Sequence, residues 1–430
     1  MPTHTVRPDI HLNLDAKAAD QAALGMLTKL SARKRFLIRV LDLIARPLTR
    51  GWDRVFPRAS RQTAEEVNRI LVVEYWNLGD IVMLTPFLRS LRIQYPKAHI
   101  TLLTSPKAAP ILEHQGLVDD LCVVRTPWAQ HYSRLKKYNP FSLLWIDLFR
   151  TLRLLRRQRI DLAFAARADI RDKFMLWFIQ VRERVGYSFG GGAYFLTKIA
   201  LPNLQNPHQS SQWLGLLPAV GKSPIVREPR LQVTPEEQRT AEGILAERGI
   251  QNGDFLVGIH PGARSLVRQW GEANFMAVVT RLQEEFPIKV IWFLDPGHKP
   301  MNGGIQGNSV SLPLRQFMSV LAKCQMLLCN DSGPMHLATA LEVPVVAIFG
   351  PGEPAWFGPL GQNHRVVIQS GFWCRPCLDY CLFDQPYCLR TVTVESVFQA
   401  AAESLSSLSV KTTEPSGLIE HPVSNVSKSK

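Results

Sequence analysis

The sequence predicts an α/β protein built from two similar units. Its 430 residues can bury large cores and are typical of two or three domains. Short apolar runs alternate with helical patterns from Arg69 onward, and the same alternation restarts at Phe255. A stretch rich in Pro, Asn, Gln and Ser lies between the two. Because this alternation is typical of parallel sheets covered by helices, we expect two units enclosing a cleft.

The first unit begins with a strand at Arg69–Tyr75, a short run rich in β-branched residues. A helix should follow, because Leu84, Phe87, Leu88 and Leu91 recur at helical spacing. Three more apolar runs predict further strands of a parallel sheet. These runs are 100–103, 121–124 and 162–165.

The second unit repeats the pattern, with a helix expected directly after Asp331. Its predicted strands are 255–259, 290–294, 326–329 and 345–349. We therefore divide the chain into a basic amphipathic leader, two domains with a linker between them, and a tail that should be disordered because it lacks core residues. The corresponding ranges are 1–66, 67–215, 216–235, 236–410 and 411–430.

The formal net charge of +14 arises from two segments. Residues 29–58 carry nine basic side chains against two acidic ones, and residues 134–159 carry eight against one. Both segments also carry large apolar residues at helical spacing. Basic amphipathic helices of this kind suit the anionic inner leaflet of a membrane. Two alternatives stay open: nucleic-acid binding, although no recognition motif is present, and solvated helices packed on a core.

No run of about 18 uninterrupted apolar residues is present, so we expect no transmembrane helix. Polar and charged residues interrupt residues 1–14, which therefore do not resemble a secretory signal. We expect a cytoplasmic protein that is peripheral on the inner face of the membrane.

The stretch Asn330–His336 is the most informative, because it joins a buried apolar run to a helix pattern through a polar glycine turn. Such a turn presents helical N–H groups to phosphate oxygens. Asp331 or Ser332 can cap the helix, Gly333 lets a phosphate approach the backbone, and His336 can reach the same ligand. A nucleotide diphosphate would fit this turn. The alternative is an ordinary helix cap with His336 on the surface.

Two further turns carry charged side chains. The first strand leads into Asp80 just before a helix, where a carboxylate could act as a general base on an attacking hydroxyl or simply cap the helix. In the second unit, Arg264 and Arg268 follow the strand at Phe255. These cations could neutralise a leaving diphosphate, or they could form structural salt bridges.

These motifs, in this order, resemble glycosyltransferase family 9, the ADP-heptose:lipopolysaccharide heptosyltransferases, over roughly residues 68–404. The resemblance implies the GT-B fold, with two facing Rossmann-like domains that hold the acceptor on the N-terminal side and the nucleotide sugar on the C-terminal side. It also implies an inverting transfer that requires no metal cofactor. The matching segments are Leu78-Gly79-Asp80, Thr85-Pro86, His260-Pro261-Gly262-Ala263, Arg268-Gln269-Trp270 and Asn330–Ala338.

The resemblance also implies a role for each matching residue. Asp80 would be the base that deprotonates the acceptor hydroxyl. Arg268 stands where family members usually have a lysine that holds the donor phosphates. The acceptor would be lipopolysaccharide core or a similar anionic glycolipid, and the donor that the resemblance implies is ADP-heptose. The remaining donor-binding residues would be Asp331, Ser332, Gly333 and His336.

Four of the seven cysteines cluster between Trp373 and Leu389. Four thiols so close in sequence could hold a structural zinc or iron ion, or they could be simple thiols in a packed loop. A metal held by four thiolates would brace the fold, because it leaves no open coordination position. The residues are Cys374, Cys377, Cys381 and Cys388.

Two other functions stay open. A nucleotide-sugar epimerase would use the same fold but no acceptor. A basic membrane or nucleic-acid adaptor would bind with steep salt dependence and transfer nothing.

Overall fold

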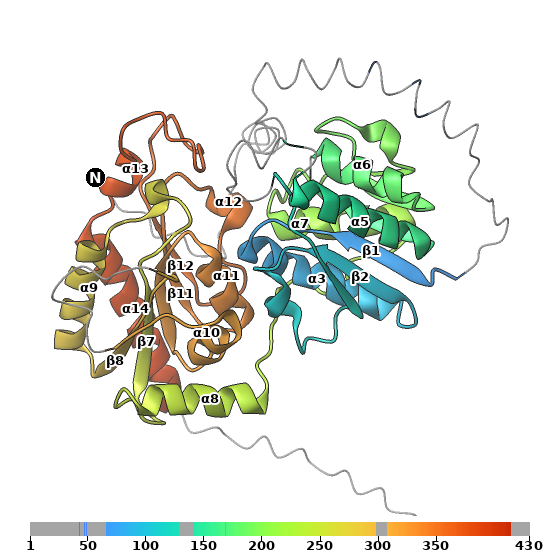
Figure 1. Cartoon of the computed structure of the whole chain (residues 1–430). Helices are drawn as coiled ribbons and strands as arrows, with labels where there is room; N and C mark the ends of the chain where they lie inside the picture. The colour runs from blue at the N-terminus through green and yellow to red at the C-terminus, as the bar shows by residue number, and fades with distance from the viewer. Residues whose placement is uncertain are drawn as a thin grey trace, which may run out of the picture.

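The computed structural model describes residues 66–128, 142–167, 169–297 and 308–413, together with positions 43, 47, 49 and 139. Two α/β units lie next to each other in these residues (Figure 1). Almost all of the expected leader, most of the first basic segment and the chain beyond residue 413 lie outside the described residues.

The first unit contains six parallel strands in the order β3-β2-β1-β4-β5-β6, which confirms the predicted parallel sheet. Strands β5 and β6 were not predicted, because charged residues interrupt their apolar patterns and β6 has only three residues. The strands are β1 (Arg69–Val73), β2 (His99–Thr104), β3 (Asp120–Val123), β4 (Leu162–Ala165), β5 (Glu183–Tyr187) and β6 (Lys198–Ala200).

Helices cover both faces of this sheet, because successive side chains of a strand point to opposite faces. Ile70 and Val72 pack in the cluster that contains helix α3, whereas Leu71 and Val73 pack with helices α5 and α6. Figure 1 shows α3 on one side of the sheet and α5 and α6 on the other. The helices are α3 (Leu78–Gln94), α5 (Leu143–Arg157) and α6 (Ile170–Ile179).

Helix α3 contains Pro86, which lacks the N–H that would otherwise bond to the carbonyl of Val82. The hydroxyl of Thr85 donates to that carbonyl at 2.7 Å instead. The hydroxyl of Thr85 therefore satisfies the carbonyl that Pro86 leaves without a backbone donor.

The second unit contains another six parallel strands, in the order β12-β11-β10-β7-β8-β9. The four predicted strands are present, and β9 and β12 are added at the two edges. The strands are β7 (Phe255–His260), β8 (Ile288–Phe293), β9 (Ser309–Val310), β10 (Met326–Asn330), β11 (Val345–Phe349) and β12 (Arg365–Ile368).

Helices α8, α10 and α11 pack on one face of the second sheet, and α9 and α14 pack on the other. Helix α14 continues to Thr413, three residues past the domain end expected at 410. The helices are α8 (Pro235–Ala246), α9 (Glu272–Glu285), α10 (Leu314–Leu321), α11 (Gly333–Ala340), α12 (Pro354–Phe357), α13 (Tyr387–Arg390) and α14 (Val394–Thr413).

Both sheets have the same topology. When the strands of each unit are numbered from its own first strand, both orders become 3-2-1-4-5-6, the order of Rossmann dinucleotide-binding folds. The strand order reverses between β1 and β4 in one unit and between β7 and β10 in the other. Ligands bind outside the carboxyl ends of the strands at such reversals. The topology therefore predicts where each unit should carry its site.

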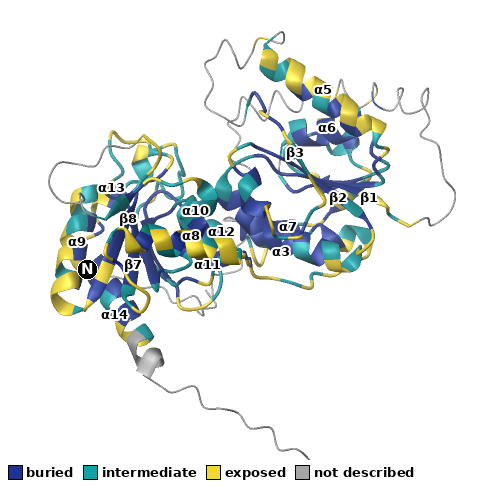
Figure 2. Cartoon of the chain, turned by 60° about the horizontal axis from the view of Figure 1, so that its bottom comes forward, coloured by how far each residue is buried: buried dark blue, intermediate teal, exposed yellow. Residues whose placement is uncertain are grey.

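The two units pack against each other through helices. Helix α3 of the first unit contacts both α11 of the second and α7 (Gln209–Leu214), which precedes the connecting segment. One cluster of buried apolar residues contains members of both units, and Figure 2 shows α3, α7 and α11 together where the units meet. The backbone N–H of Leu231 in the connecting segment also donates to the carbonyl of Ala340 at 2.7 Å.

Helix α5 has one face buried on the sheet and one face exposed. Leu148, Leu152 and Leu155 are buried on the sheet, whereas Leu143 and Leu154 are exposed among arginines. Figure 2 shows this helix largely exposed on the outside of its unit. Among the described residues, none of the helices combines the length and apolar character needed to span a bilayer.

Candidate active site

Asp80 lies in the first turn of α3, just beyond the carboxyl end of β1. Its Oδ2 accepts hydrogen bonds from the backbone N–H of Asn77 at 3.0 Å and from Asn77 Nδ2 at 2.9 Å. Its Oδ1 lies 2.6 Å from Nη2 of Arg167. Because a carboxylate oxygen has two lone pairs, Oδ1 keeps one acceptor position. Asp80 thus completes the capping box of the helix and can still accept a proton, so the two interpretations of this residue are compatible.

Two charged residues beside Asp80 were not identified from the sequence. Glu74 was expected inside the first strand, but β1 ends at Val73, so Glu74 begins the turn. Arg167 follows β4, and its Nε lies 3.2 and 3.1 Å from the two carboxylate oxygens of Glu74. Because β1 and β4 are adjacent parallel strands, their carboxyl ends bring these residues together. The sequence signal that could have identified Glu74 and Arg167 is their position, since each is the charged residue that directly follows an apolar run.

The second unit places its polar turn at the equivalent position. Asn330 ends β10, and its Nδ2 donates to the carbonyl of Pro261 at 2.6 Å, while its Oδ1 accepts from the backbone N–H of Trp270 at 3.2 Å. Asn330 therefore ties together the two ends of the loop that follows β7. That loop carries Arg264 and Arg268, so it is fixed against the turn that carries Asp331.

Both arginines bind carboxylates in this structure, as the salt-bridge alternative predicted. Nη1 of Arg268 lies 2.6 Å from Oδ2 of Asp331, and its Nε lies 2.7 Å from Oδ1 of Asp379. Arg264 pairs with the same Asp379, and its Nη1 donates to Oδ1 of Asn77 at 2.9 Å. Burial raises the pKa of Asp331 above its ordinary value, and the charge of Arg268 opposes that increase.

These contacts form a continuous polar chain from one unit to the other. It begins at the candidate base and ends in the turn that precedes α11. Asp379, which the sequence did not indicate, holds both arginines at the centre of the chain. A diphosphate could replace this carboxylate, since guanidinium groups bind phosphate oxygens in the same forked geometry. The chain runs through Asp80, Asn77, Arg264, Asp379, Arg268 and Asp331.

The remaining residues of the polar turn are positioned differently from the expectation. Ser332 occupies the N-cap position of α11, but its side chain makes no capping hydrogen bond, and Asp331 binds Arg268 instead. Gly333 lies close to the base turn, because a Cβ added there would be 3.3 Å from Cβ of Leu78. The expected caps of α11 are therefore not formed by either side chain.

His336 is 7% exposed and lies against Gly79 of the other unit. A Cβ added to Gly79 would be 2.5 Å from Cδ2 of His336, so a side chain at this position would require the imidazole or the base turn to move. Burial lowers the pKa of His336 to about 3, which keeps the ring neutral at physiological pH. The structure packs His336 at the boundary between the units, so the alternative of a surface position is wrong. Its expected contact with a ligand beside Asp331 stays a prediction.

None of the seven cysteines, all of which the structure describes, is joined to another in a disulfide. Burial raises the pKa of Cys388 to about 11, with Cys374, Cys377 and Cys381 near enough to contribute. In the described part of the chain, however, no three His, Cys, Asp or Glu side chains converge as metal ligands would. The thiols are neighbours, but their present arrangement does not fit a metal ion. Asp379 lies within this segment, so the loop also contributes to the polar chain.

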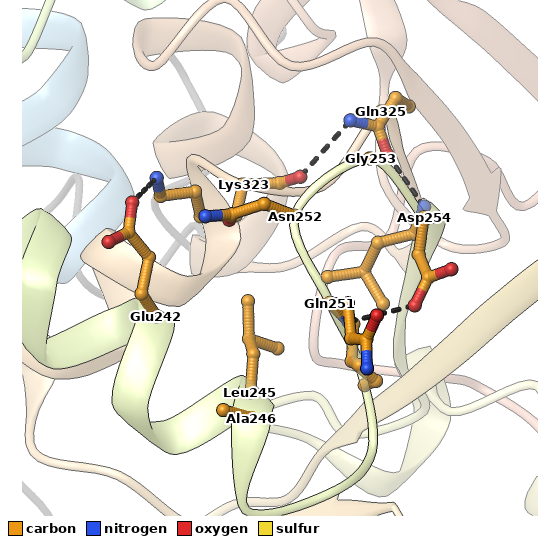
Figure 3. Close-up of a pocket in the computed structure, with 11 residues that line it drawn as sticks. Glu242, Leu245, Ala246, Gln251, Asn252, Gly253, Asp254, Lys323 and Gln325 are labelled. Atoms are coloured by element: carbon orange, nitrogen blue, oxygen red, sulfur yellow. Dashed lines mark hydrogen bonds and ion pairs between the residues drawn. The ribbon is translucent and has the colours of Figure 1, made fainter.

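A hollow of about 340 Å³ lies elsewhere on the second unit, between α8 and the loop 251–254 (Figure 3). That loop precedes β7, and Gln325 precedes β10, so the hollow lies at the amino ends of these strands. Lys323 and Glu242 form an ion pair of 2.6 Å at its rim. Because ligands of open α/β sheets bind at the opposite ends of the strands, this hollow is not the candidate site.

Comparison with known protein families gives a match to the model of glycosyltransferase family 9 (heptosyltransferase) over residues 148–387. Lipopolysaccharide heptosyltransferase 2 of Salmonella typhimurium is 23% identical over 322 residues, which cover 70% of this chain and 87% of that protein.

Solved structures with the same fold include the glycosyl transferase family 9 protein from Veillonella parvula, with a TM-score of 0.64 and 21% identity over 80% of this chain and 99% of that one. The ADP-heptose lps heptosyltransferase II of E. coli gives a TM-score of 0.61 and 19% identity over 80% of this chain and 100% of that one. At these identities the structures support the GT-B fold that the motifs implied.

Proposed function

Because the chain belongs to glycosyltransferase family 9, the heptosyltransferases, we propose that it transfers a heptose or related sugar from a nucleotide-diphosphate donor to a lipid-linked acceptor. The donor is ADP-heptose, and the acceptor is lipopolysaccharide core or a similar anionic glycolipid. The transfer inverts the anomeric carbon. The relatives named as lipopolysaccharide heptosyltransferases support the choice of sugar and acceptor.

The polar chain between the two units is the observation that carries this proposal. It starts at a carboxylate with one free acceptor position, passes through the guanidinium groups of Arg264 and Arg268, and ends at Asp331 in the turn after β10. A direct displacement needs a base behind the acceptor oxygen and positive charge at the leaving group. The two requirements are met on opposite units, at the strand-order reversal of each sheet.

In the proposed reaction, Oδ1 of Asp80 takes the proton of the acceptor hydroxyl as that oxygen forms its bond to the anomeric carbon. The bond between the anomeric carbon and the diphosphate oxygen breaks, and its electron pair leaves with ADP. Arg264 and Arg268 release Asp379 and neutralise the charge of the diphosphate. The two arginines thereby take the role that a metal ion has in other transferases. The reaction therefore requires no metal cofactor.

Helix α5 supports a peripheral position on the inner face of the cytoplasmic membrane. Its exposed surface combines apolar Leu143 and Leu154 with Arg150, Arg153 and Arg157. Apolar contacts and arginines together suit an anionic lipid surface. Such a surface would bring the enzyme to a lipid-linked acceptor. Membrane binding would also account for the positive charge of α5, so we propose no nucleic-acid partner.

The cysteine cluster enters this proposal only as a structural element. A zinc or iron ion would have to draw Cys374, Cys377, Cys381 and Cys388 closer together than they are here. No step of transfer depends on such an ion. Elemental analysis of the purified protein tests the idea, and a metal content far below one equivalent contradicts it.

The proposed activity is tested by incubating the full-length protein with ADP-heptose and heptose-deficient lipopolysaccharide. We expect ADP and glycosylated acceptor to appear in equal amounts, and the configuration of the new bond to be opposite to that of the donor. Release of ADP that does not require acceptor would contradict the transferase. Conversion of the nucleotide sugar to an isomer without acceptor would instead identify an epimerase. A thermal-shift screen of other nucleotide sugars identifies the donor if ADP-heptose fails.

A further inference from the structure

A buried ion pair lies directly beneath the candidate base. The side chain of Glu74 is 0% exposed, and both of its oxygens contact Nε of Arg167. The same guanidinium reaches Oδ1 of Asp80 through Nη2 at 2.6 Å. One positive charge is therefore shared by two carboxyl groups, and one of these is the proposed base.

Trp76 adds two contacts to the group formed by Glu74, Arg167 and Asp80, which we call the trio. Glu74 Oε1 also accepts a hydrogen bond from the backbone N–H of Trp76 at 3.2 Å, and the guanidinium of Arg167 lies 5.2 Å from the centroid of the Trp76 ring. The Trp76 indole and the adjacent strand ends thus fix the guanidinium between its partners. Because one guanidinium carries the positive charge for both carboxyl groups, a change of charge at one of them alters the electrostatic attraction left for the other.

Other ionisable groups near the trio either are neutral or have their own partners. Asp172 of α6 is buried, accepts a hydrogen bond from Tyr75 Oη, and has a pKa raised well above its ordinary value, mainly by burial. Asp169 and Arg171 pair with each other. From the other unit, the neutral ring of His336 lies against the base turn. Apart from Asp80 itself, Glu74 is therefore the ionisable group that acts most directly on Arg167.

We propose that Glu74 is a positioning residue that sets the proton affinity of Asp80 by controlling how much of the charge of Arg167 acts on it. This inference rests on the proposed transferase function. When Glu74 is ionised, it shares the guanidinium, and the carboxylate of Asp80 attracts the proton of the acceptor hydroxyl more strongly. When Glu74 is protonated, the full charge of Arg167 acts on Asp80 and weakens the base.

Both states of Glu74 are accessible near neutral pH. Burial raises the pKa of Glu74 from 4.5 to about 7, the charge of Arg167 opposes this increase, and the charge of Asp80 adds to it. The rate of transfer should therefore increase with pH around neutrality as Glu74 loses its proton. This increase in rate would reflect the ionisation of Glu74, a buried residue that acts through Arg167 and not on the substrate itself.

The test is the pH profile of kcat/KM for the full chain and for Glu74→Gln, measured from about pH 5.5 to about pH 9. The glutamine keeps the shape of the side chain but cannot ionise. We expect an inflection near pH 7 in the original protein. The variant should lose that inflection and stay at the low-pH rate, roughly tenfold below the original plateau. An unchanged inflection in Glu74→Gln overturns the proposal.

Glu183→Gln is the matched control. Glu183 is partly exposed and lies 2.9 Å from Lys198 at the far edge of the same sheet. The same chemical change there should leave the pH profile of transfer unaltered. If both variants change the profile alike, the effect is a general loss of charge and the specific role of Glu74 is refuted.

A second measurement requires neither substrate nor turnover, so it stays informative if the proposed function is wrong. The free energy of unfolding is measured against pH for the original protein and for Asp80→Asn. Removing the charge of Asp80 leaves Arg167 to Glu74 alone and should lower the pH at which Glu74 titrates by about one unit. A stability profile that Asp80→Asn does not move contradicts the coupling, even where transfer itself cannot be assayed.

Discussion

Replacing Gly79 by alanine tests how the two units meet. Gly79 lies in the first turn of α3, and the imidazole of His336 from α11 occupies the space where a side chain would be. An added Cβ would lie 2.5 Å from Cδ2 and 3.1 Å from Nε2 of that ring. Carbon atoms in contact normally stay at about 3.5–4.0 Å, so α3 and α11 must separate or His336 must leave its position.

The size of the effect follows from two opposing contributions. Overpacking a dense interior costs about 1–3 kcal/mol, whereas alanine is favoured over glycine within a helix by about 0.5–1 kcal/mol. Gly243 in α8 isolates the second contribution, because nothing lies within 4 Å of a Cβ added there. We therefore expect Gly243→Ala to stabilise the protein by about 0.5–1 kcal/mol. Gly79→Ala should be about 1–3 kcal/mol less stable than Gly243→Ala.

The assay is urea unfolding of the original protein, both alanine variants, His336→Ala and the double variant Gly79→Ala/His336→Ala. In the absence of the imidazole, Gly79→Ala should become stabilising and match Gly243→Ala. The double-mutant cycle should give a coupling energy of about 1–3 kcal/mol. If Gly79→Ala is as stable as Gly243→Ala in the presence of His336, the close contact of α3 with α11 is refuted.

Three further predictions concern the donor site, acid stability and the membrane. Asp379→Asn should tighten the binding of ADP, measured by calorimetry, about fivefold. The reason is that the nucleotide no longer has to displace a carboxylate whose ion pairs contribute about 1 kcal/mol. Weaker binding of ADP by the variant would contradict this competition. The unfolding free energy should be lower at pH 5 than at pH 7. The reason is that three buried neutral histidines take up protons on unfolding below about pH 6.5, which outweighs the opposite changes at Glu74 and Asp172, two carboxyl groups whose pKa burial raises; a higher stability at pH 5 than at pH 7 would contradict it. The histidines, whose pKa burial lowers to about 4, 3 and 4, are His208, His336 and His364. The charge reversal Arg150→Glu/Arg153→Glu should reduce sedimentation of the protein with anionic vesicles at least tenfold. The control Arg239→Glu, on an exposed position of α8, should not reduce it. Equal losses in both variants would exclude α5 as the docking surface.

The fold was predictable because its strongest sequence signals coincide with its buried strands. The predicted run 345–349 is β11 itself, and 326–329 differs from β10 by one residue. The four strands that were not predicted lie at or near sheet edges, and three of them are either interrupted by charge or only two or three residues long. β9, for example, has only two residues, and β5 contains the buried Arg184, whose guanidinium donates to backbone carbonyls. Neither feature produces an apolar periodicity.

The candidate site was predictable where a residue follows a strand within a motif, as Asp80 and Asp331 do. Residues that reach the site from a distant segment were not. Arg167 joins Asp80 only because β4 pairs with β1, and Asp379 reaches Arg268 from a loop more than a hundred residues away in sequence. Such partners depend on strand order and loop path. A single sequence does not specify either of these directly.

The most direct test of the central claim is single-turnover transfer from ADP-heptose by the original protein and by Asp80→Asn, with donor affinity measured in parallel. Asparagine keeps the size of the side chain but cannot take the proton of the acceptor hydroxyl. We predict that the rate falls by about 10²–10⁴ while the affinity for donor changes less than about twofold. Transfer at the original rate, or a loss confined to donor affinity, would show that the carboxylate beside Arg167 is not the base.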